Sequence, residues 1–375
     1  MNNGYTLKAD ILERSQSVFY GQLFEECPQC LAQQSLQWAD VISPISPDRP
    51  YFLVVREESN KGVLGGLPLY YFEAKLGGIL TSVPHAGPLG GGFYRGDMDL
   101  NLRRLVYSTL LSSAIQLAKK MKCISLTIIT NPFTDDAALY KESSTPNYIM
   151  NNFCQAIDLS FTLKNEGAYE TGKSSYNNHL RKNLAKAEKA GVVVSWGDDA
   201  DFEPWYEIHC KRHKELGVPP LPESLLRGIL SVMKPAGMGG LAVAKIDKCV
   251  VGGCFYIWHR DVADAFIMSS DSDCFDCGVN YAVTYFAVRY FRKRGVKWFN
   301  WQSCKKNSGV YLFKKRWGSR EFPYQFLTWT YPGFEEVFKV EAEDTIKWYQ
   351  WHYIAPFEAI RKKITNGVFD KGCMT

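Results

Sequence analysis

Two glycine-pair segments, far apart in the chain, have the same surroundings. Residues 63–69 read VLGGLPL and residues 250–256 read VVGGCFY. Each follows a β-like run with a polar turn and precedes two further β-like runs. Each copy then continues with a loop, an amphipathic helix that ends in basic residues, and another strand; the helices are expected at 101–122 and 279–294. Because six elements recur in the same order, the sequence predicts one folding unit used twice.

The repeated order predicts an α/β (α+β) protein of two tandem domains, each a mixed, mainly antiparallel sheet flanked by helices. A length of 375 residues fits two domains, which we place at 1–155 and 156–335. The remaining residues, 336–375, are expected to form a helical tail with an aromatic stripe at helical spacing: Ile346, Tyr349, Tyr353, Phe357 and Ile360. This helix either packs on the body or lies on lipid headgroups, so a peripheral membrane contact stays open.

Composition and charge limit the kinds of protein that this chain can be. Apolar residues make up 46% and charged residues 22% of the chain, which is typical of a globular protein with real cores. The net charge of +5 is compatible with anionic substrates but lacks the dense basic stripe of a DNA binder, so no DNA partner is expected. The N-terminal sequence has no signal-peptide pattern and no run of about 18 apolar residues exists. We therefore expect a cytoplasmic protein, with the inner membrane face left open by the tail.

The cysteine and histidine residues are not expected to bind a metal. The chain has 11 cysteines, an odd number, and most lie inside apolar runs, as buried free thiols do in a reducing compartment. Two CxxC pairs, starting at Cys27 and Cys274, are too far apart in sequence for a compact zinc module. His209 and His213 are one helical turn apart but lack the Glu of HExxH, so His209 is kept as a structural or substrate-contact residue.

Several stretches resemble the FemABX family, the peptidoglycan-bridge aminoacyltransferases, and its FemAB-like relatives. NNHLRKNLAKAEKAGVVV is similar to the basic helix that opens the family's second half, and NSGVYLFKKRWGSREFPY to its late FK…(W/F)G motif. HCKRHKELGVPPLPESLL and TSVPHAGPLGGG resemble its His…Gly-x-Pro segment and its first-half Pro/Gly loop. Together they span most of residues 40–330. The resemblance implies two tandem GNAT-like domains and the transfer of an aminoacyl or acyl group to an amine of a cell-envelope or polysaccharide precursor.

The resemblance also assigns roles in the late motif. Lys314 matches the position at which a lysine ammonium stabilises the tetrahedral intermediate of acyl transfer, which needs no acylated residue. Phe313 beside it would line the pocket, and Arg316 is included among the substrate contacts. The residues alone leave another interpretation open, namely that Lys314, Lys315 and Arg316 form a basic strand edge that faces water.

Other substrate contacts are expected outside this motif. Arg181 and Lys182 lie in a basic helix suited to a phosphate-bearing acceptor, although such runs are commonly solvated helix faces. Asn280 and Tyr281 open the helix of the second copy. His85, in the Pro/Gly loop, is included as a residue that faces the cleft between the two halves, although the residues alone equally fit a loop histidine on the surface.

The acyl donor stays open between aminoacyl-tRNA and acyl-CoA, and no prosthetic group is expected. CoA-binding GNAT enzymes carry R/Q-x-x-G-x-G/A at a helix start, where backbone N–H groups hold the pyrophosphate. Neither SDCFDCGVNYA nor the first copy's GPLGGGFYRGD follows that pattern, which disfavours CoA. The long helical arm of typical FemABX proteins is absent, and the PHAG loop lacks their common arginine, which disfavours tRNA. Three functions remain: a FemAB-like aminoacyl- or acyltransferase, a CoA-dependent N-acyltransferase on a sugar amine, and a non-catalytic binding module.

Overall fold

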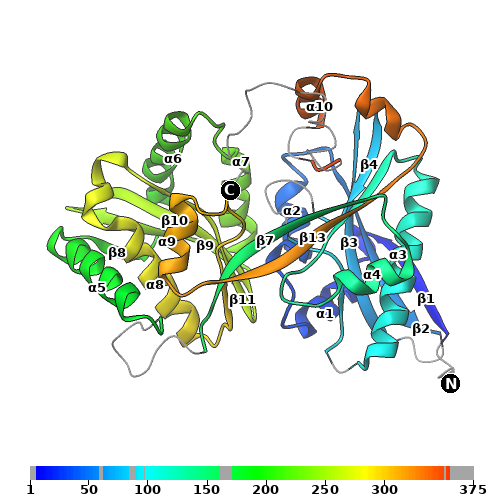
Figure 1. Ribbon diagram of the computed structural model, residues 1–375, viewed down its shortest axis with the longest axis horizontal. Coiled ribbons are helices and arrows are strands. Elements are labelled where there is room, and N and C mark those ends of the chain that lie inside the picture. The colour runs from blue at the N-terminus through cyan, green and yellow to red at the C-terminus, as the bar shows by residue number, and fades with distance from the viewer. Residues whose placement is uncertain are drawn as a thin grey trace. The chain divides into compact units, whose positions relative to one another are not determined.

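The computed structural model describes residues 6–58, 62–83, 89–96, 98–160, 171–349 and 352–354. Their elements form two compact units (Figure 1). The first contains the described residues up to Asn152 and those from Pro323 onwards, and the second contains those from Phe153 to Phe322. The first boundary lies near the expected one at 155. The last strand and the tail belong to the first unit rather than to a second domain ending at 335 and a separate tail, because that strand pairs with a first-unit strand.

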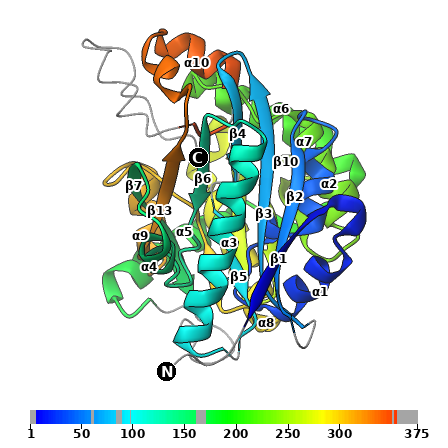
Figure 2. The same ribbon diagram turned by 90° about the vertical axis from the view of Figure 1, so that its right-hand side faces the viewer.

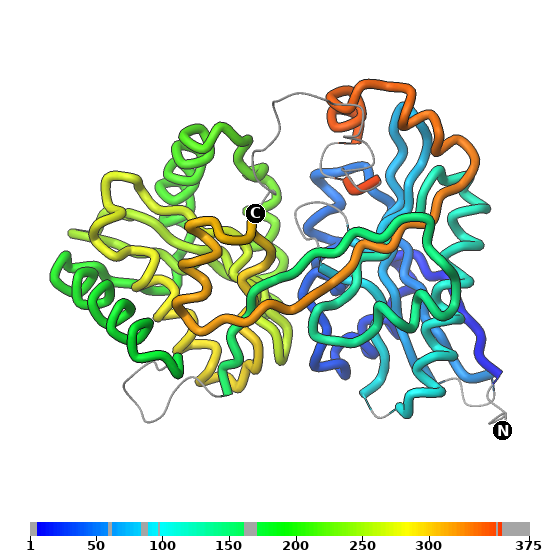
Figure 3. The backbone as a smooth tube through the Cα atoms, in the orientation of Figure 1, coloured from blue at the N-terminus to red at the C-terminus, as the bar shows by residue number. Residues whose placement is uncertain are grey.

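The sheet of the first unit has the strand order β1-β2-β3-β4-β6-β13-β7, with β5 paired to β3. All the described pairings in it are antiparallel except that of β4 with β6. In Figure 3 the traces of β7 and β13 run side by side. The strands are β1 (Leu7–Glu13), β2 (Arg49–Glu57), β3 (Val63–Ala74), β4 (Gly77–Thr81), β5 (Phe93–Tyr94), β6 (Ser125–Ile129), β7 (Tyr148–Asp158) and β13 (Arg320–Thr330).

Helices cover both faces of this sheet. The long α3 lies across β1, β2 and β3 on one face, as Figure 2 shows, while α1 packs against β2 and β3. Asp99 caps the start of α3 by accepting a hydrogen bond from Leu102 N–H (2.8 Å). The helices are η1 (Arg14–Gln16), α1 (Val18–Glu26), η2 (Ala32–Gln34), α2 (Leu36–Ile42), α3 (Leu100–Lys120), α4 (Ala137–Ser143), η6 (Phe334–Phe338) and α10 (Ala342–Tyr349).

In the second unit, the last part of β7 continues into the order β7-β12-β11-β10-β9-β8. Only β11 and β12 are parallel. These strands are β8 (Val193–Trp196), β9 (Gly239–Ile246), β10 (Cys249–His259), β11 (Val262–Ser270) and β12 (Trp298–Asn300).

The helices of the second unit also lie on both faces of its sheet. Helix α8 packs against β8 to β11 with α5 beside it, and α6 packs against β10 and β11. The helices are α5 (Ser174–Lys189), η3 (Asp199–Asp201), α6 (Phe202–Leu216), α7 (Glu223–Gly228), the π-helical η4 (Ile229–Met233), η5 (Ser272–Cys277), α8 (Val279–Lys293) and α9 (Gly309–Arg316).

The two glycine pairs occupy equivalent places in the two units. A Cβ atom on Gly65 of β3 would overlap Val106 of α3, and a Cβ atom on Gly252 of β10 would come within 3.0 Å of Val279 of α8. In both copies glycine therefore lets the crossing helix lie close to the sheet. The order β2-β3-β4-β5-α3-β6 corresponds to β9-β10-β11-η5-α8-β12. The predicted class, a mixed α/β chain built from a repeated unit, is confirmed.

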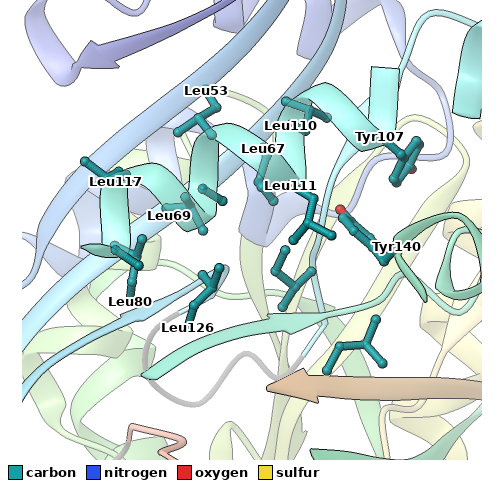
Figure 4. Packing of buried hydrophobic residues seen from close by; sticks show 14 of the residues in the cluster. Leu53, Leu67, Leu69, Leu80, Tyr107, Leu110, Leu111, Leu117, Leu126 and Tyr140 are labelled. Atoms are coloured by element: carbon teal, nitrogen blue, oxygen red, sulfur yellow. The ribbon is translucent and has the colours of Figure 1, made fainter. Parts of the chain in front are cut away.

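Each unit has its own apolar core. In the first unit, Leu110 and Leu111 of α3 pack onto Leu53, Leu67 and other strand residues, as Figure 4 shows. In the second unit, buried residues of α8 pack with those of β9, β10 and α5 around Tyr256. Separate cores explain why each copy can fold around its own helix.

The described part of the tail packs on the first unit. Tyr349 at the end of α10 donates from its hydroxyl to Gly77 O (2.8 Å). The His352 ring stacks on Phe72 at 3.8 Å and its Nε2 faces the Asp48 carboxylate at 2.9 Å. The rest of the aromatic stripe, Phe357 and Ile360, lies outside the described residues. A membrane contact by that part stays a prediction.

Candidate active site

The sheet of the second unit separates between β11 and β12. These parallel neighbours pair from Val262 with Trp298 only as far as Asp264 with Asn300, although β11 continues to Ser270 alongside β10. Among the strands of the described chain, none pairs with the outer side of β11 after Asp264. Its backbone N–H and C=O groups there need other partners, so the separation can hydrogen-bond a ligand.

A β-bulge follows directly after β12. Trp301 N–H donates to Gln155 O (2.8 Å) and Gln155 N–H donates to Gln302 O (3.3 Å), so two residues face one residue of β7. Gln302 has a φ of 60°, an unfavourable value for a residue with a side chain. Asn300 supports the bulge, because its Oδ1 accepts from Gln302 N–H (3.0 Å) and its Nδ2 donates to the buried Asp264. Bulges and strained dihedrals of this kind re-aim side chains beside functional sites.

Lys314 is buried on α9 with its ammonium at this bulge. Its side chain is only 5% exposed, and Nζ donates to Trp301 O (2.8 Å) and Ser303 O (3.2 Å), with a longer contact to Gln302 O (3.4 Å). Burial lowers the pKa of Lys314, whereas three carbonyl oxygens suit the ammonium, since only the protonated form has three N–H donors. Residues 309–316 are helical and Lys314 faces inward, so the interpretation as a water-facing strand edge does not hold.

Two residues whose carbonyl oxygens contact Lys314 also carry a buried side-chain donor with no hydrogen-bond partner within the described chain: Trp301 Nε1 and Gln302 Nε2. Asn280 Oδ1, at the start of α8, is a third such atom. Trp301 and Gln302 are 5% and 8% exposed. Each unsatisfied buried group costs about 1–3 kcal/mol of folding stability. A bound ligand or water that supplied the missing partners would recover that cost.

Two thiols adjoin the lysine. Cys304 Sγ donates to Gln155 Oε1 (3.1 Å), and Cys154 and Cys304 both act electrostatically on Lys314. Burial raises the pKa of Cys154, so it remains a neutral thiol. A neutral buried thiol is a poor nucleophile, so Cys154 does not suit an acyl-cysteine.

Phe313, the residue before Lys314 on α9, contacts the start of α8. Phe313 packs edge-on against Trp301 (5.7 Å between centroids) and Tyr281 (5.0 Å). The Tyr281 ring is also near Trp317, which is fully buried. Lys314, Phe313 and Tyr281, three predicted site residues, are thus brought together.

A cationic group of side chains surrounds His179 on α5. His179 Nε2 lies 2.8 Å from the Tyr281 hydroxyl. Partial burial lowers the pKa of His179, and the charges of Arg316, Lys182 and Lys186 lower it further. Predicted residues Lys182 and Arg316 are therefore both close enough to act on the same imidazole, and this group of positive charges favours an anion.

The start of α8 differs from a CoA-type phosphate loop. Its N-cap is Gly278 with a φ of 72°, and no side chain caps the helix. A Cβ atom on Gly278 would lie 2.5 Å from Asn183 O and 3.2 Å from Ala187 N, so α5 covers one side of this end. The uncapped N–H groups still favour a negative charge there.

Two predicted site residues lie elsewhere, and a third falls outside the described residues. His209 is completely buried; its Nδ1 meets Ser269 Oγ (3.0 Å), its Nε2 accepts from Leu221 N–H (3.0 Å), and burial lowers its pKa to about 3. Both ring nitrogens are occupied, so in this arrangement His209 holds α6 to β11. Arg181 is exposed and bonds to Asn178 Oδ1 (2.9 Å) of its own helix. His85 lies outside the described residues.

Sequence reasoning missed His179 and Gln302. His179 stands inside the quoted stretch NNHLRKNL, but nothing in that stretch reveals its contact with Tyr281, which lies 102 positions away. Gln302 follows a strand with no turn residue, so the bulge and its positive φ had no local signal. Both residues depend on tertiary pairing.

The described residues hold no group of three or more His, Cys, Asp or Glu side chains that could bind a metal ion. None of their helices has both the length and the apolar content that crossing a membrane requires.

Comparison with known proteins places the second unit in a recognisable fold. Residues 174–307 match the family model of the acetyltransferase (GNAT) domain, a range that runs from α5 past β12. No curated protein sequence matches the chain. The family match covers the strand separation and the α5 residues His179, Lys182 and Lys186, but not α9, which carries Lys314 and Arg316.

Solved structures extend the likeness to most of the chain. The crystal structure of FemX is similar over 88% of this chain and 99% of that one, with a TM-score of 0.65 and 12% identity. The C-terminal DUF2156 domain of a putative lysylphosphatidylglycerol synthetase from Agrobacterium fabrum covers 84% of this chain and 93% of its own, with a TM-score of 0.54 and 11% identity. A conserved protein of unknown function from Bacteroides thetaiotaomicron covers 87% and 100%, with a TM-score of 0.54 and 10% identity. The chain has a GNAT-type acyltransferase fold similar to that of FemX.

Proposed function

We propose that this chain is a FemAB-like acyltransferase that forms an amide on an amine of a cell-envelope or polysaccharide precursor. The acyl group would come from a carrier, either aminoacyl-tRNA or acyl-CoA. The reaction class is supported by the GNAT domain match over 174–307 and by the similarity in fold to FemX. Fold alone does not assign a reaction, so the proposal depends on the site.

One observation carries the proposal. The buried ammonium of Lys314 donates to backbone carbonyls of the short stretch after β12, and two residues of that stretch, Trp301 and Gln302, carry buried side-chain N–H donors. These side-chain donors have no partner in the described part of the protein. Acyl transfer develops negative charge on the carbonyl oxygen, and preorganised donors in a buried site stabilise that charge strongly. We infer that the acyl carbonyl lies here, with Lys314 exchanging its longest contact, Gln302 O at 3.4 Å, for the substrate oxygen.

The cationic group supports an acceptor or donor that carries phosphate. Arg316, Lys182 and Lys186 all act on His179, and Phe313 connects this group to the Lys314 stretch through Tyr281 and Trp301. Arginine and lysine at one place bind phosphate through charge-assisted hydrogen bonds. A nucleotide- or lipid-linked sugar would satisfy this arrangement.

A second candidate, a CoA-dependent N-acyltransferase on a sugar amine, is favoured by one feature. The N-terminus of α8 carries no side-chain cap, so its N–H groups are available for a pyrophosphate. Against it, Gly278 faces the backbone of α5 on one side. A thermal-shift series with acetyl-CoA and long-chain acyl-CoA separates the two candidates, because stabilisation by CoA esters supports the second.

The catalytic proposal is tested with Lys314→Met and a matched control, Lys315→Met. Both remove one ammonium from adjacent positions of α9, but Lys315 is exposed. We expect Lys314→Met to lower the rate of acyl transfer by about 100-fold or more and Lys315→Met to leave it nearly unchanged. Product formation would be followed by mass spectrometry with aminoacyl-tRNA and acyl-CoA donors, and thermal melting would confirm that both variants are folded.

Two results would contradict the proposal. Full activity of a folded Lys314→Met variant would remove the electrostatic role of this residue. No transfer from any donor, together with an unchanged cell envelope in a strain that lacks the protein, would favour the non-catalytic binding module.

A further inference from the structure

Strand β1 forms an edge of the first unit's sheet. It pairs antiparallel with β2, and no other strand of the described chain pairs with it. Glu58 N–H donates to Thr6 O (3.0 Å) and the two residues are directly opposite, which makes them a hydrogen-bonded pair. Such pairs alternate along an antiparallel ladder. Lys8 and Asp10 therefore direct their backbone groups to β2, and the odd-numbered residues of β1 direct theirs outward.

On the outward side of this edge, no strand of the described chain pairs with β1. The outward-directed backbone groups belong to Leu7, Ala9 and Ile11. Leu7 and Ala9 pack their side chains against the core of the first unit, whereas Ile11 is 41% exposed. A seven-residue edge strand whose outward N–H and C=O groups have no strand partner among the described residues, and which carries an exposed isoleucine, is a template for a further strand.

The sequence of β1 is complementary to itself in one antiparallel register. If two copies are related by a two-fold axis at Ala9, Leu7 lies opposite Ile11 of the other copy and Lys8 lies opposite Asp10. Both the lysine and the aspartate are accessible, with side chains 69% and 34% exposed. The register also sets outward-directed residues against one another, so their backbone groups can form hydrogen bonds.

Neighbouring two-fold registers are disfavoured by charge. An axis at Lys8 would set two ammonium groups against each other, and an axis at Asp10 would set two carboxylates against each other. Like charges directly opposite destabilise a strand pair, whereas opposite charges stabilise it. Electrostatics thus selects the Ala9 register.

We propose that β1 pairs with β1 of a second copy of this chain, giving an isologous dimer with a sheet that continues across the two-fold axis at Ala9. A two-fold interface of this kind uses the same patch on both copies. The inference rests on the edge strand alone and does not depend on the proposed function.

The test uses the full chain and two charge variants, Lys8→Asp and Asp10→Lys. Each variant alone sets like charges against each other twice, so we expect the dimer dissociation constant to rise about tenfold or more in each. Mixed together, the two variants set opposite charges against each other at all four positions and should recover a dimer. Sedimentation velocity from about 1 to 100 μM would measure the association of the unaltered chain, of each variant and of their mixture, and we expect the unaltered chain to be dimeric in this range.

A backbone variant gives an independent readout. Ala9→Pro removes an outward N–H that has no partner within the sheet, so the fold should persist by circular dichroism while the dimer is lost. Ala9→Ser is the matched control and should remain dimeric.

Three outcomes would overturn the proposal. The first is a chain that stays monomeric at about 100 μM. The second is a dimer unaffected by Lys8→Asp, since association would then use another surface. The third is a monomer that takes up an added peptide with the sequence of residues 7–13 without self-associating, which would assign this edge to a different strand.

Discussion

Acid should destabilise the second unit through His209. This imidazole is completely buried, donates from Nδ1 to Ser269 Oγ and accepts from Leu221 N–H at Nε2. A proton on Nε2 would face the Leu221 N–H and break that bond. Burial and the neighbouring His213 therefore lower the pKa of His209 to about 3.

The magnitude follows from linkage between protonation and folding. The unfolded chain has an ordinary histidine pKa of about 6.5, so between pH 6.5 and the folded pKa of about 3 the unfolded state binds the extra proton. Stability from His209 is therefore present above pH 6.5 and is lost as the pH falls. Lowering the pH from 8 to 5 should remove about 2 kcal/mol of unfolding free energy through this residue alone.

The assay is urea unfolding at pH 8 and pH 5, for the unaltered chain and for His209→Gln. Glutamine offers an acceptor to Leu221 N–H but does not titrate. At pH 8 the variant should be less stable than the unaltered chain, and between pH 8 and pH 5 its unfolding free energy should fall by about 2 kcal/mol less. His179, whose pKa is also lowered, contributes equally to both proteins and cancels. If acidification lowered the unfolding free energy of the two proteins by the same amount, His209 would not be the group responsible.

Three further results are expected. Gly278→Ala should lower the unfolding free energy by about 3 kcal/mol, because its φ is positive and the new Cβ would lie 2.5 Å from the backbone oxygen of Asn183. The control Gly237→Ala, with a similar φ of 70° but no atom within 4 Å of the new Cβ, should lower it by about 1 kcal/mol. Urea unfolding would measure both values. Gln302→Gly should leave stability unchanged or higher while lowering acyl transfer about tenfold, since it relieves the positive φ and removes the unpartnered amide; equal activity would remove Gln302 from the site. Arg316→Ala should raise the pKa of His179 in an NMR titration, because it removes the positive charge that lowers this pKa most, whereas Lys189→Ala, on the same helix as His179, should not.

The fold could be predicted from the sequence because its signals are local. The apolar stripes of the two crossing helices, the basic ends of those helices and the repeated glycine pairs each fix one element, and their order fixes the repeat. The domain limits could not be predicted in the same way. Strand β13 follows the second unit in sequence but pairs with β6 of the first, from Phe326 with Ile129 to Thr330 with Ser125. Nothing in residues 320–330 shows which strand they will join.

The candidate site was predictable only in part, for a related reason. Lys314 and Phe313 were found through a motif, and their surroundings were not. Three charged residues in a row resemble a solvated edge, yet α9, which begins at Gly309 after the N-cap Ser308, turns Lys314 inward and leaves Lys315 exposed. The sequence left His209 open between a structural role and a substrate contact, and only its tertiary hydrogen bonds to Ser269 and Leu221 show its structural environment.

The two copies of the repeated unit explain why we place the chemistry in the second. In the first copy, β4 and β6 stay joined beyond Thr81, because Ser82 N–H donates to Thr127 O and Ser82 Oγ accepts from Ile129 N–H.

The N-terminus of the crossing helix in the first copy, α3, is also occupied. The carboxylate of Asp99 occupies the N-terminus of α3, so a second anion there would be repelled. In the second copy both features are reversed: β11 and β12 separate after Asp264, and α8 starts at Gly278 without a side-chain cap. In a duplicated fold, one copy with separated strands and an uncapped helix is enough to hold an acyl group. The other copy, whose strands stay paired, can then serve binding or assembly. This asymmetry is why substitutions at the strand separation should change the reaction, whereas substitutions at β1 should change only the association of the chain.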